Sequence, residues 1–192
     1  FKFNGQLHEV RLLIDGQHNA LNGAAALAAV KSLYPQIPED ELVKALAAVK
    51  AMFGRGELIS FGNRKLVLQL IKNPASFRQA MHILDIHKPG AVGIIINDDH
   101  ADGRDVSWLW DVDFRPLQNL PVITSGTRGA DMANRLKYDE IKVIKNQSNL
   151  KQLPLEILAE SGQKDTAIIF ATYTAMLAVR KAISNLTKLE AV

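Results

Sequence analysis

The sequence contains no cysteine among its 192 residues. Disulfide bonds, thiolate metal sites and a cysteine nucleophile on this chain are therefore excluded. Long apolar runs are missing too, because the longest, such as residues 91–96, are far shorter than the ~20 residues that a membrane-spanning helix needs. The five histidines are scattered and no H-E-x-x-H motif occurs. The sequence thus indicates neither a transmembrane segment nor a histidine-based metal site within this chain.

The familiar nucleotide-binding motifs are absent as well. There is no G-x-x-x-x-G-K-[ST] run, and no G-x-G-x-x-G follows an expected strand. If the chain serves a nucleotide-using enzyme, we expect the phosphate loop to lie elsewhere. The 23 basic and 20 acidic residues give a net charge of only +3, which is too mixed for a dedicated nucleic-acid binder.

What the sequence does have is an ordinary globular composition. Hydrophobic residues make up 47% and charged residues 22%, so the chain can bury a core. It begins at Phe1, inside a stretch that we interpret as a strand. We expect it to be a C-terminal fragment of a longer cytosolic protein.

Residues 1–60 are expected to complete a domain whose larger part lies upstream. The pattern indicates a β-rich stretch at 7–14, helices at 20–34 and 39–52, and a loop at 54–57. Asp15-Gly16 is a turn signal after the β-rich stretch. One or two strands and two helices are too little to close a hydrophobic core alone.

Residues 61–192 alternate between apolar strands and helices of about ten residues. Strands are expected at 66–71, 91–97, 121–124, 141–144 and 166–170, and helices at 76–87, 129–137, 150–161 and 174–183. This alternation predicts an α/β fold, a Rossmann-like and mainly parallel sheet with helices on both faces. Ligands of such sheets bind at the carboxyl ends of the strands. The polar segments expected there are 72–74, 97–105, 125–128, 146–148 and 171–174.

Several of the candidate site residues have a structural and a functional interpretation. Asn19 is placed as the N-cap of a helix, and Asn22 lies one turn on, so both amides can face one ligand. Arg55, between two glycines, is either a solvated turn residue or a guanidinium that forks onto phosphate. Lys72 directly follows a strand and either points into the cleft or is a surface lysine before a helix that starts near Pro74.

Segment 97–105 is the densest in polar groups, with four aspartates, a histidine and an arginine. A cation site is one interpretation, but the EF-hand spacing with its glutamate is missing. A second is a carboxylate that orients a histidine, with the nucleophile on another chain. A third is a solvated acidic turn with a tryptophan-anchored strand behind it. Further along, Arg128 precedes a helix as a candidate anion ligand, and Thr172–Thr174 either bind a carboxylate or cap the last helix.

In this order, the pieces resemble the Mur ligase superfamily, which joins an amino acid to a peptide through an ATP-derived acyl phosphate. The similarity lies in Asn19-Ala20-Leu21-Asn22, Gly54-Arg55-Gly56-Glu57 and Lys72-Asn73-Pro74. Three longer runs resemble the MurT branch, the ATP-dependent subunits of lipid II isoglutaminyl synthase. These runs are residues 53–57, residues 71–77 and the specific stretch D-G-R-D-V-S-W-L-W-D at 102–111; residues 172–177 and Arg180 extend the match.

The resemblance implies a ligase of peptidoglycan, and thus of cell-wall and cell-shape, biosynthesis. Such subunits activate the α-carboxyl of D-isoglutamate in lipid II with ATP, and a glutamine amidotransferase partner, GatD, supplies ammonia. An aspartate of the ATP-dependent subunit is expected to complete the partner's Cys–His triad. The matching residue is Asp105, with Asp102 as the other choice.

The remaining roles are implied in the same way. Asn19, Asn22 and Arg55 would face the nucleotide, and Lys72 would touch the γ-phosphate or acyl phosphate. Arg128, Thr172, Tyr173 and Thr174 would lie near the substrate carboxyl.

The family's phosphate loop, Mg²⁺ ligands and a four-cysteine zinc ribbon would lie upstream, so the fragment alone is expected to be inactive. Residues 1–60 would be the end of the central ATPase domain and residues 61–192 the C-terminal domain. The resemblance implies a heterodimer with GatD in the cytoplasm, at the inner face of the membrane that holds lipid II. The alternatives are an amino-acid-adding Mur ligase, a folylpolyglutamate synthase or a non-catalytic docking domain.

Overall fold

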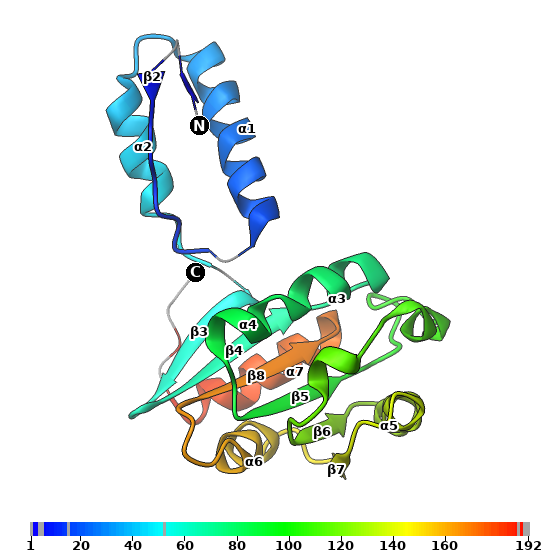
Figure 1. Ribbon diagram of the computed structural model, residues 1–192. Helices are drawn as coiled ribbons and strands as arrows, with labels where there is room; N and C mark the ends of the chain where they lie inside the picture. Colours follow the sequence, from blue (N-terminus) through cyan, green and yellow to red (C-terminus); the bar gives the residue numbers. More distant parts are fainter. Residues whose placement is uncertain (1, 4–5, 15, 52, 188, 190–192) are drawn as a thin grey trace. The chain divides into compact units, whose positions relative to one another are not determined.

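A computed structural model describes residues 2–3, 6–14, 16–51, 53–187 and 189 of the chain (Figure 1). The chain folds as two compact units, Phe1–Ala51 and Met52–Val192. The expected division lay between residues 60 and 61. Residues 55–61 form a strand that pairs with the next strand of the second unit, which is why the structural boundary lies earlier.

The first unit holds two short strands and two helices. Strands β1 (Lys2–Phe3) and β2 (Gln6–Leu7) pair antiparallel, and helices α1 (Gln17–Leu33) and α2 (Glu39–Ala47) follow. The acidic first turn of α2 suits the helix dipole. The helix ends at Ala47, before the expected 52, while Lys50 forms an isolated bridge with Leu13. The expected turn residue Asp15 lies outside the described residues.

Helix α1 begins earlier than the position of Asn19 suggested. Gly16 precedes the helix, and the backbone N–H of Asn19 donates to the Gly16 carbonyl at 3.0 Å. The prediction that Asn19 is the N-cap is therefore wrong, because the residue already lies inside the first turn. Asn19 and Asn22 remain on one side of the helix, three residues apart.

The second unit is built on a six-stranded sheet in the order β3-β4-β8-β5-β6-β7. Its strands are β3 (Arg55–Phe61), β4 (Arg64–Leu70), β5 (Ala91–Ile95), β6 (Val122–Ser125), β7 (Val143–Gln147) and β8 (Thr166–Ala171). Strand β3 pairs antiparallel with β4, and all other pairs are parallel. The central strands β5 and β8 are buried almost throughout, which explains their continuous apolar sequences.

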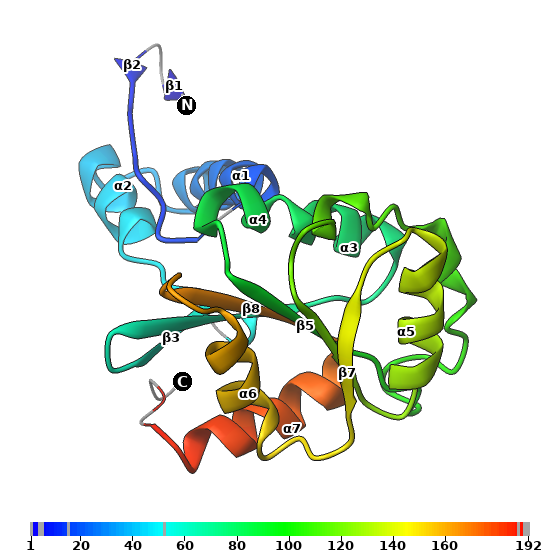
Figure 2. The ribbon, with the colours of Figure 1, turned by 60° about the horizontal axis from the view of Figure 1, so that its bottom comes forward.

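Helices cover both faces of this sheet, as the alternating sequence predicted (Figure 2). On one face, α3 (Pro74–Met81), α4 (Ile83–His87) and α5 (Gly129–Tyr138) bury Phe77, Ile83 and Leu136. On the other, α6 (Leu153–Glu160) and α7 (Tyr173–Ser184) bury Ile157 and Val179. The expected fold class is confirmed. No helix in the described part of the chain is long and apolar enough to cross a membrane.

Several local expectations differ from the structure. The expected helix 76–87 is split at His82 into α3 and α4. The tryptophan-rich segment is not a strand: it forms the 3-10 helix η1 (Ser107–Asp111), followed by η2 (Arg115–Leu117). Strand β7 starts at Val143, because the Ile141 backbone N–H still donates to the Leu136 carbonyl and closes α5.

Candidate functional site

The polar segments that follow four neighbouring strands lie side by side at one edge of the sheet. The backbone N–H of Ile71, after β4, donates to Ala171 at the end of β8, and that of Thr172 donates to Ile95 at the end of β5. The Ile96 N–H, after β5, in turn donates to Ser125 at the end of β6. Because these strands are parallel, their carboxyl ends form one edge, where ligands of such sheets bind.

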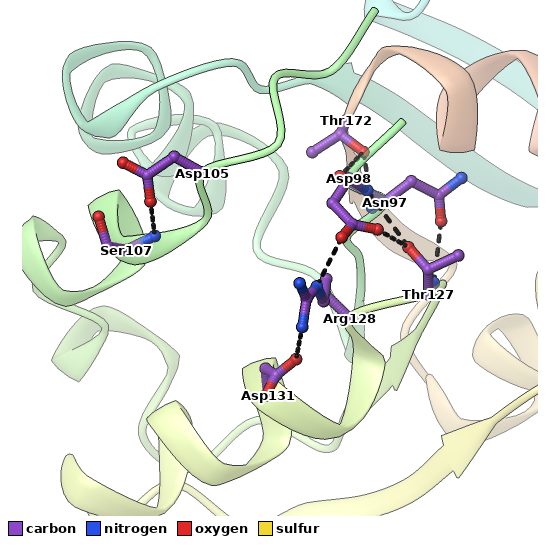
Figure 3. A network of polar contacts seen from close by, with 8 residues as sticks. All are labelled: Asn97, Asp98, Asp105, Ser107, Thr127, Arg128, Asp131 and Thr172. Carbon is purple, nitrogen blue, oxygen red and sulfur yellow. Dashed lines mark hydrogen bonds and ion pairs between the residues drawn. The ribbon is translucent and has the colours of Figure 1, made fainter. Parts of the chain in front are cut away.

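Asn97 joins three of these segments (Figure 3). Its backbone N–H donates to Thr172 Oγ1 at 2.9 Å, its side-chain amide donates to Thr174 Oγ1 at 2.9 Å, and its Oδ1 accepts the Thr127 N–H at 3.1 Å. The close approach requires Gly126, at φ 92°, since a Cβ there would lie 2.3 Å from the Ile96 carbonyl oxygen. The sequence placed Asn97 at a strand end but did not reveal this central role.

Arg128 lies at the start of α5 and is engaged by two carboxylates. Its Nε donates to Asp98 Oδ2 at 2.8 Å, and its Nη1 donates to Asp131 Oδ2 at 3.2 Å. Hydrogen bonds from Thr127 and then Arg128 lower the pKa of the Asp98 carboxyl. The contribution of this pair to folding stability is therefore present at pH values above the ordinary pKa of an aspartate. It is lost as the pH falls through the lowered pKa of Asp98. The expected substrate role of Arg128 stays a prediction.

The Asp102 carboxylate is docked onto the first turn of α7. Its Oδ1 accepts the Thr174 backbone N–H at 2.8 Å, and its Oδ2 accepts the Thr174 hydroxyl at 2.5 Å. Asp99 Oδ2 also lies 3.0 Å from that hydroxyl. Asp102 therefore anchors the 98–105 loop to the sheet edge, and both of its oxygens are used inside the chain.

Asp105 has a different environment from Asp102. Asp105 is exposed, and its Oδ1 accepts a hydrogen bond from the backbone N–H of Ser107 at 2.8 Å (Figure 3). The Ser107 side chain and then its backbone N–H lower the pKa of the Asp105 carboxyl below the ordinary value. The group is therefore held in place, ionised at neutral pH, and presented to solvent.

Lys72 lies two residues beyond the end of β4, and its backbone is fixed by the cap of α3. The N–H groups of Lys72 and Asn73 donate to Ser76 Oγ at 2.9 and 3.0 Å, and the Ser76 N–H donates to Asn73 Oδ1 at 2.8 Å. Pro74 occupies the start of the helix, as expected. The lysine side chain is exposed at the sheet edge.

Arg55 belongs to a strand and not to the expected loop. It opens β3 opposite Gln69, at the same edge as Lys72, and the register shifts between Arg55 and Glu57 around Gly56, at φ 80°. The shift is a β-bulge, which bends the backbone at Gly56 while β3 still pairs with β4. The sequence Gly54-Arg55-Gly56 did not predict this bulge. Arg55 is exposed.

A buried ion pair fixes the bulge. Glu57 accepts the Gly54 N–H and Arg180 Nη2, both at 2.9 Å, and the Arg180 guanidinium lies 4.8 Å from the centre of the Phe53 ring. The side chains of Glu57 and Arg180 are 11% and 14% exposed, so neither charge is freely solvated. Sequence proximity gave no hint of this pair, which joins residues 123 positions apart.

The other predicted site residues differ in solvent exposure and in whether their side chains are already hydrogen-bonded. Thr172 is 3% exposed with its hydroxyl engaged by Asn97, whereas Tyr173, at the first position of α7, is 46% exposed. Asn19 and Asn22 lie in the first unit, with Asn22 exposed. Their expected nucleotide contacts stay predictions.

Chemically, the edge offers anion ligands more than metal ligands. Arg55 and Lys72 are exposed cations for which no carboxylate contact occurs within the described residues, so their charge suits a phosphate group. Among the described residues, no three His, Asp or Glu side chains are grouped to hold a metal ion. Arg55 and Lys72 therefore offer exposed positive charge at this edge, and the exposed carboxylate of Asp105 can accept a hydrogen bond from outside the chain.

Known proteins resemble this chain in sequence. The family model described as MurT ligase C-terminal matches residues 70–176. The MurT subunit of lipid II isoglutaminyl synthase (glutamine-hydrolyzing) from Streptococcus pneumoniae is 34% identical over 96% of this chain and 41% of its own length. The subunit of the same name from Staphylococcus aureus strain COL is 31% identical over 68% of this chain and 30% of its own length. The chain thus spans less than half of these relatives.

Solved structures show the same fold. The UDP-N-acetylmuramate-alanine ligase MurC from Thermotoga maritima has a TM-score of 0.67 at 16% identity, over 95% of this chain and 40% of that one. The MurF ligase from Thermotoga maritima in complex with ADP has a TM-score of 0.62 at 17% identity, over 90% of this chain and 39% of that one.

Proposed function

Because this chain belongs to the MurT ligase family, we propose that it is part of an ATP-dependent subunit that amidates the α-carboxyl of D-isoglutamate in lipid II. The ammonia comes from glutamine hydrolysed by a partner subunit, GatD. One observation supports this proposal beyond the family. The Ser107 N–H fixes the exposed carboxylate of Asp105, and this chain has no cysteine nucleophile that the carboxylate could serve.

The ATP-dependent half-reaction uses the sheet edge. The substrate carboxylate takes the γ-phosphoryl group of ATP, and ammonia then forms the C–N bond while phosphate leaves. Lys72 places its positive charge beside the phosphoryl oxygens, where negative charge builds up. Arg55 holds the nucleotide phosphates. For Asn19 and Asn22, in the first unit, a contact with the nucleotide stays a prediction. Arg128 and Thr172–Thr174 lie toward the substrate carboxyl.

The glutamine-hydrolysing half-reaction uses Asp105. We assign it, and not Asp102, as the third member of the partner's triad. Asp102 already accepts two hydrogen bonds from Thr174, whereas the carboxylate of Asp105 is exposed and lies outside that anchor. An ionised carboxylate there can accept the N–H of a histidine and fix its tautomer.

The rest of the machinery belongs to the parts of the relatives that this chain does not cover. In this proposal, the first unit (Phe1–Ala51) ends the central ATPase domain and the second unit (Met52–Val192), which includes β3, forms the C-terminal domain. The phosphate loop, the Mg²⁺ ligands and a structural zinc site are assigned to the uncovered parts. The complex works in the cytoplasm, at the inner face of the membrane that carries lipid II.

Reconstitution tests the proposal. The full-length subunit and GatD are mixed, and glutamate release from glutamine and amidation of lipid II are measured with and without each subunit and ATP. We expect hydrolysis to require both subunits, and amidation to require ATP in addition. Incorporation of an amino acid without GatD would instead favour an amino-acid-adding ligase, and binding of GatD without any effect on either reaction would favour a docking domain.

Replacing Arg55 by Ala should weaken ATP binding by the full-length subunit. A hydrogen bond between charged groups contributes about 1.5–3 kcal/mol, which corresponds to roughly ten- to hundredfold in affinity. Calorimetric titration with ATP measures the change. Lys65→Ala is the matched control, because this exposed residue lies at the opposite end of β4. Equal affinities of the Arg55→Ala variant and the wild type would remove Arg55 from the nucleotide site.

A further inference from the structure

We infer that Trp110 and Tyr138 form an aromatic anchor on which the glutamine-hydrolysing partner docks. This inference rests on the proposed function, because it takes Asp105 to lie in the contact with that partner. The assignment of Asp105 does not say which surface binds the partner, and the aromatic anchor supplies that surface.

Both side chains are large, exposed and in contact with each other. Trp110 is 54% exposed and Tyr138 is 68% exposed. Their ring centres are 4.9 Å apart, with an angle of 75° between the ring planes. Trp108, two residues earlier, turns the other way and packs edge-on against Phe77 in the core. Trp110 is thus an aromatic residue that the fold leaves at the surface.

A buried arginine holds the anchor in place. Arg135 is 6% exposed, and its guanidinium lies 5.1 Å from the ring centre of Trp110 and 5.1 Å from that of Phe114. It also pairs with Asp139 at 3.0 Å. Nη1 makes this ion pair without hydrogen-bond geometry, so the two rings and the ion pair position the guanidinium beside Trp110.

The same arginine fixes the backbone that carries Trp110. Its Nε donates to the Leu109 carbonyl at 3.2 Å, and its Nη2 donates to the Val112 carbonyl at 2.8 Å. Arg78 Nη1 donates to the Asp111 carbonyl at 2.9 Å from the α3 side. Aromatic side chains held rigid before binding lose little entropy on association, which is the property of interface hot spots.

The anchor is continuous with Asp105. The Ser107 N–H that holds the Asp105 carboxylate begins η1, and Trp110 lies in the same short helix. A histidine that reaches Asp105 brings its own protein surface close to the start of η1. Tryptophan and tyrosine are among the residues that most often dominate binding energy, so this surface can add affinity to the hydrogen bond at Asp105.

The experiment measures affinity and catalysis separately in the full-length subunit. Trp110→Ala and Tyr138→Ala are titrated with purified GatD by calorimetry, and Leu155→Ala serves as control because Leu155 is 48% exposed on α6, at the other face of the sheet. We expect each aromatic variant to bind roughly ten- to hundredfold more weakly and the control to bind like the wild type. At saturating GatD, glutamine hydrolysis by the aromatic variants should return to the wild-type rate.

One further variant makes the outcome decisive. Trp110→Phe retains an aromatic ring over Arg135, and Tyr138→Ala leaves the described contacts of Arg135 intact, so neither depends on repacking of the core. Wild-type affinity in both alanine variants overturns the inference, as does a change in self-association without a change in GatD affinity. The proposed function fails differently: wild-type subunit that does not bind GatD, or Asp105→Asn that leaves hydrolysis intact, would contradict it.

Discussion

Replacing Asp105 by Asn should abolish glutamine hydrolysis in the complex while the two subunits still assemble. The amide oxygen can still accept the Ser107 N–H, so the loop keeps its geometry. Toward the partner's histidine, however, a neutral amide replaces an ionised acceptor, and the imidazole loses both its tautomer and its charge stabilisation. In a Ser–His–Asp triad the same change lowers kcat on the order of 10⁴-fold, and we expect a loss of roughly 10³–10⁴-fold here.

Three measurements define this result. Glutamate release reports hydrolysis, calorimetry reports assembly, and amidation with added ammonia reports the ATP-dependent half-reaction, which should be fully retained. Asp165→Asn is the matched control, because Asp165 is an exposed aspartate directly before β8, at the opposite end of the sheet. Loss of hydrolysis in Asp102→Asn together with full activity in Asp105→Asn would reverse the assignment, and full activity in both would leave the loop a structural element.

Replacing Lys72 by Ala should abolish ATP-dependent amidation and leave GatD binding intact. Lys72 is an exposed cation two residues beyond the end of β4, and its backbone is fixed by the Asn73–Ser76 cap. Removal of one preorganised group that stabilises transition-state charge costs about 10²–10³ in kcat. Amidation of lipid II with saturating ammonia measures the effect without involving the partner's chemistry.

Two substitutions test whether the charge at Lys72 is responsible. Lys72→Arg retains a cation at the same backbone position and should recover part of the rate, while Lys65→Ala at the opposite end of β4 should be unaffected. Thermal unfolding of each variant separates loss of charge from loss of the α3 cap. A near-normal amidation rate in Lys72→Ala would exclude this residue from the mechanism.

The fold class could be predicted because its signals are local. Continuous apolar strands at 91–95 and 166–171 alternate with helices of matching length, and burial on both faces requires that pattern. The α3 start at Pro74 was equally local, since a cap and a proline act within one turn. Boundaries were less predictable: Gly54–Glu57 has the composition of a loop, but pairing with Gln69 draws Arg55 into β3.

For the candidate site, too, the sequence predicts the local features and the tertiary structure decides the rest. The sequence by itself determined which polar segments follow the carboxyl ends of the strands, that Lys72 and Asp105 lie in these segments, and that no cysteine accompanies them. Only the tertiary structure decided which polar groups are already used. It ties Asp102 to Thr174, 72 residues away, and it buries Arg135 between Trp110 and Phe114. A carboxylate or a guanidinium has the same formula whether it is free or paired, and its partner is chosen by the packing of distant elements, which no local pattern encodes.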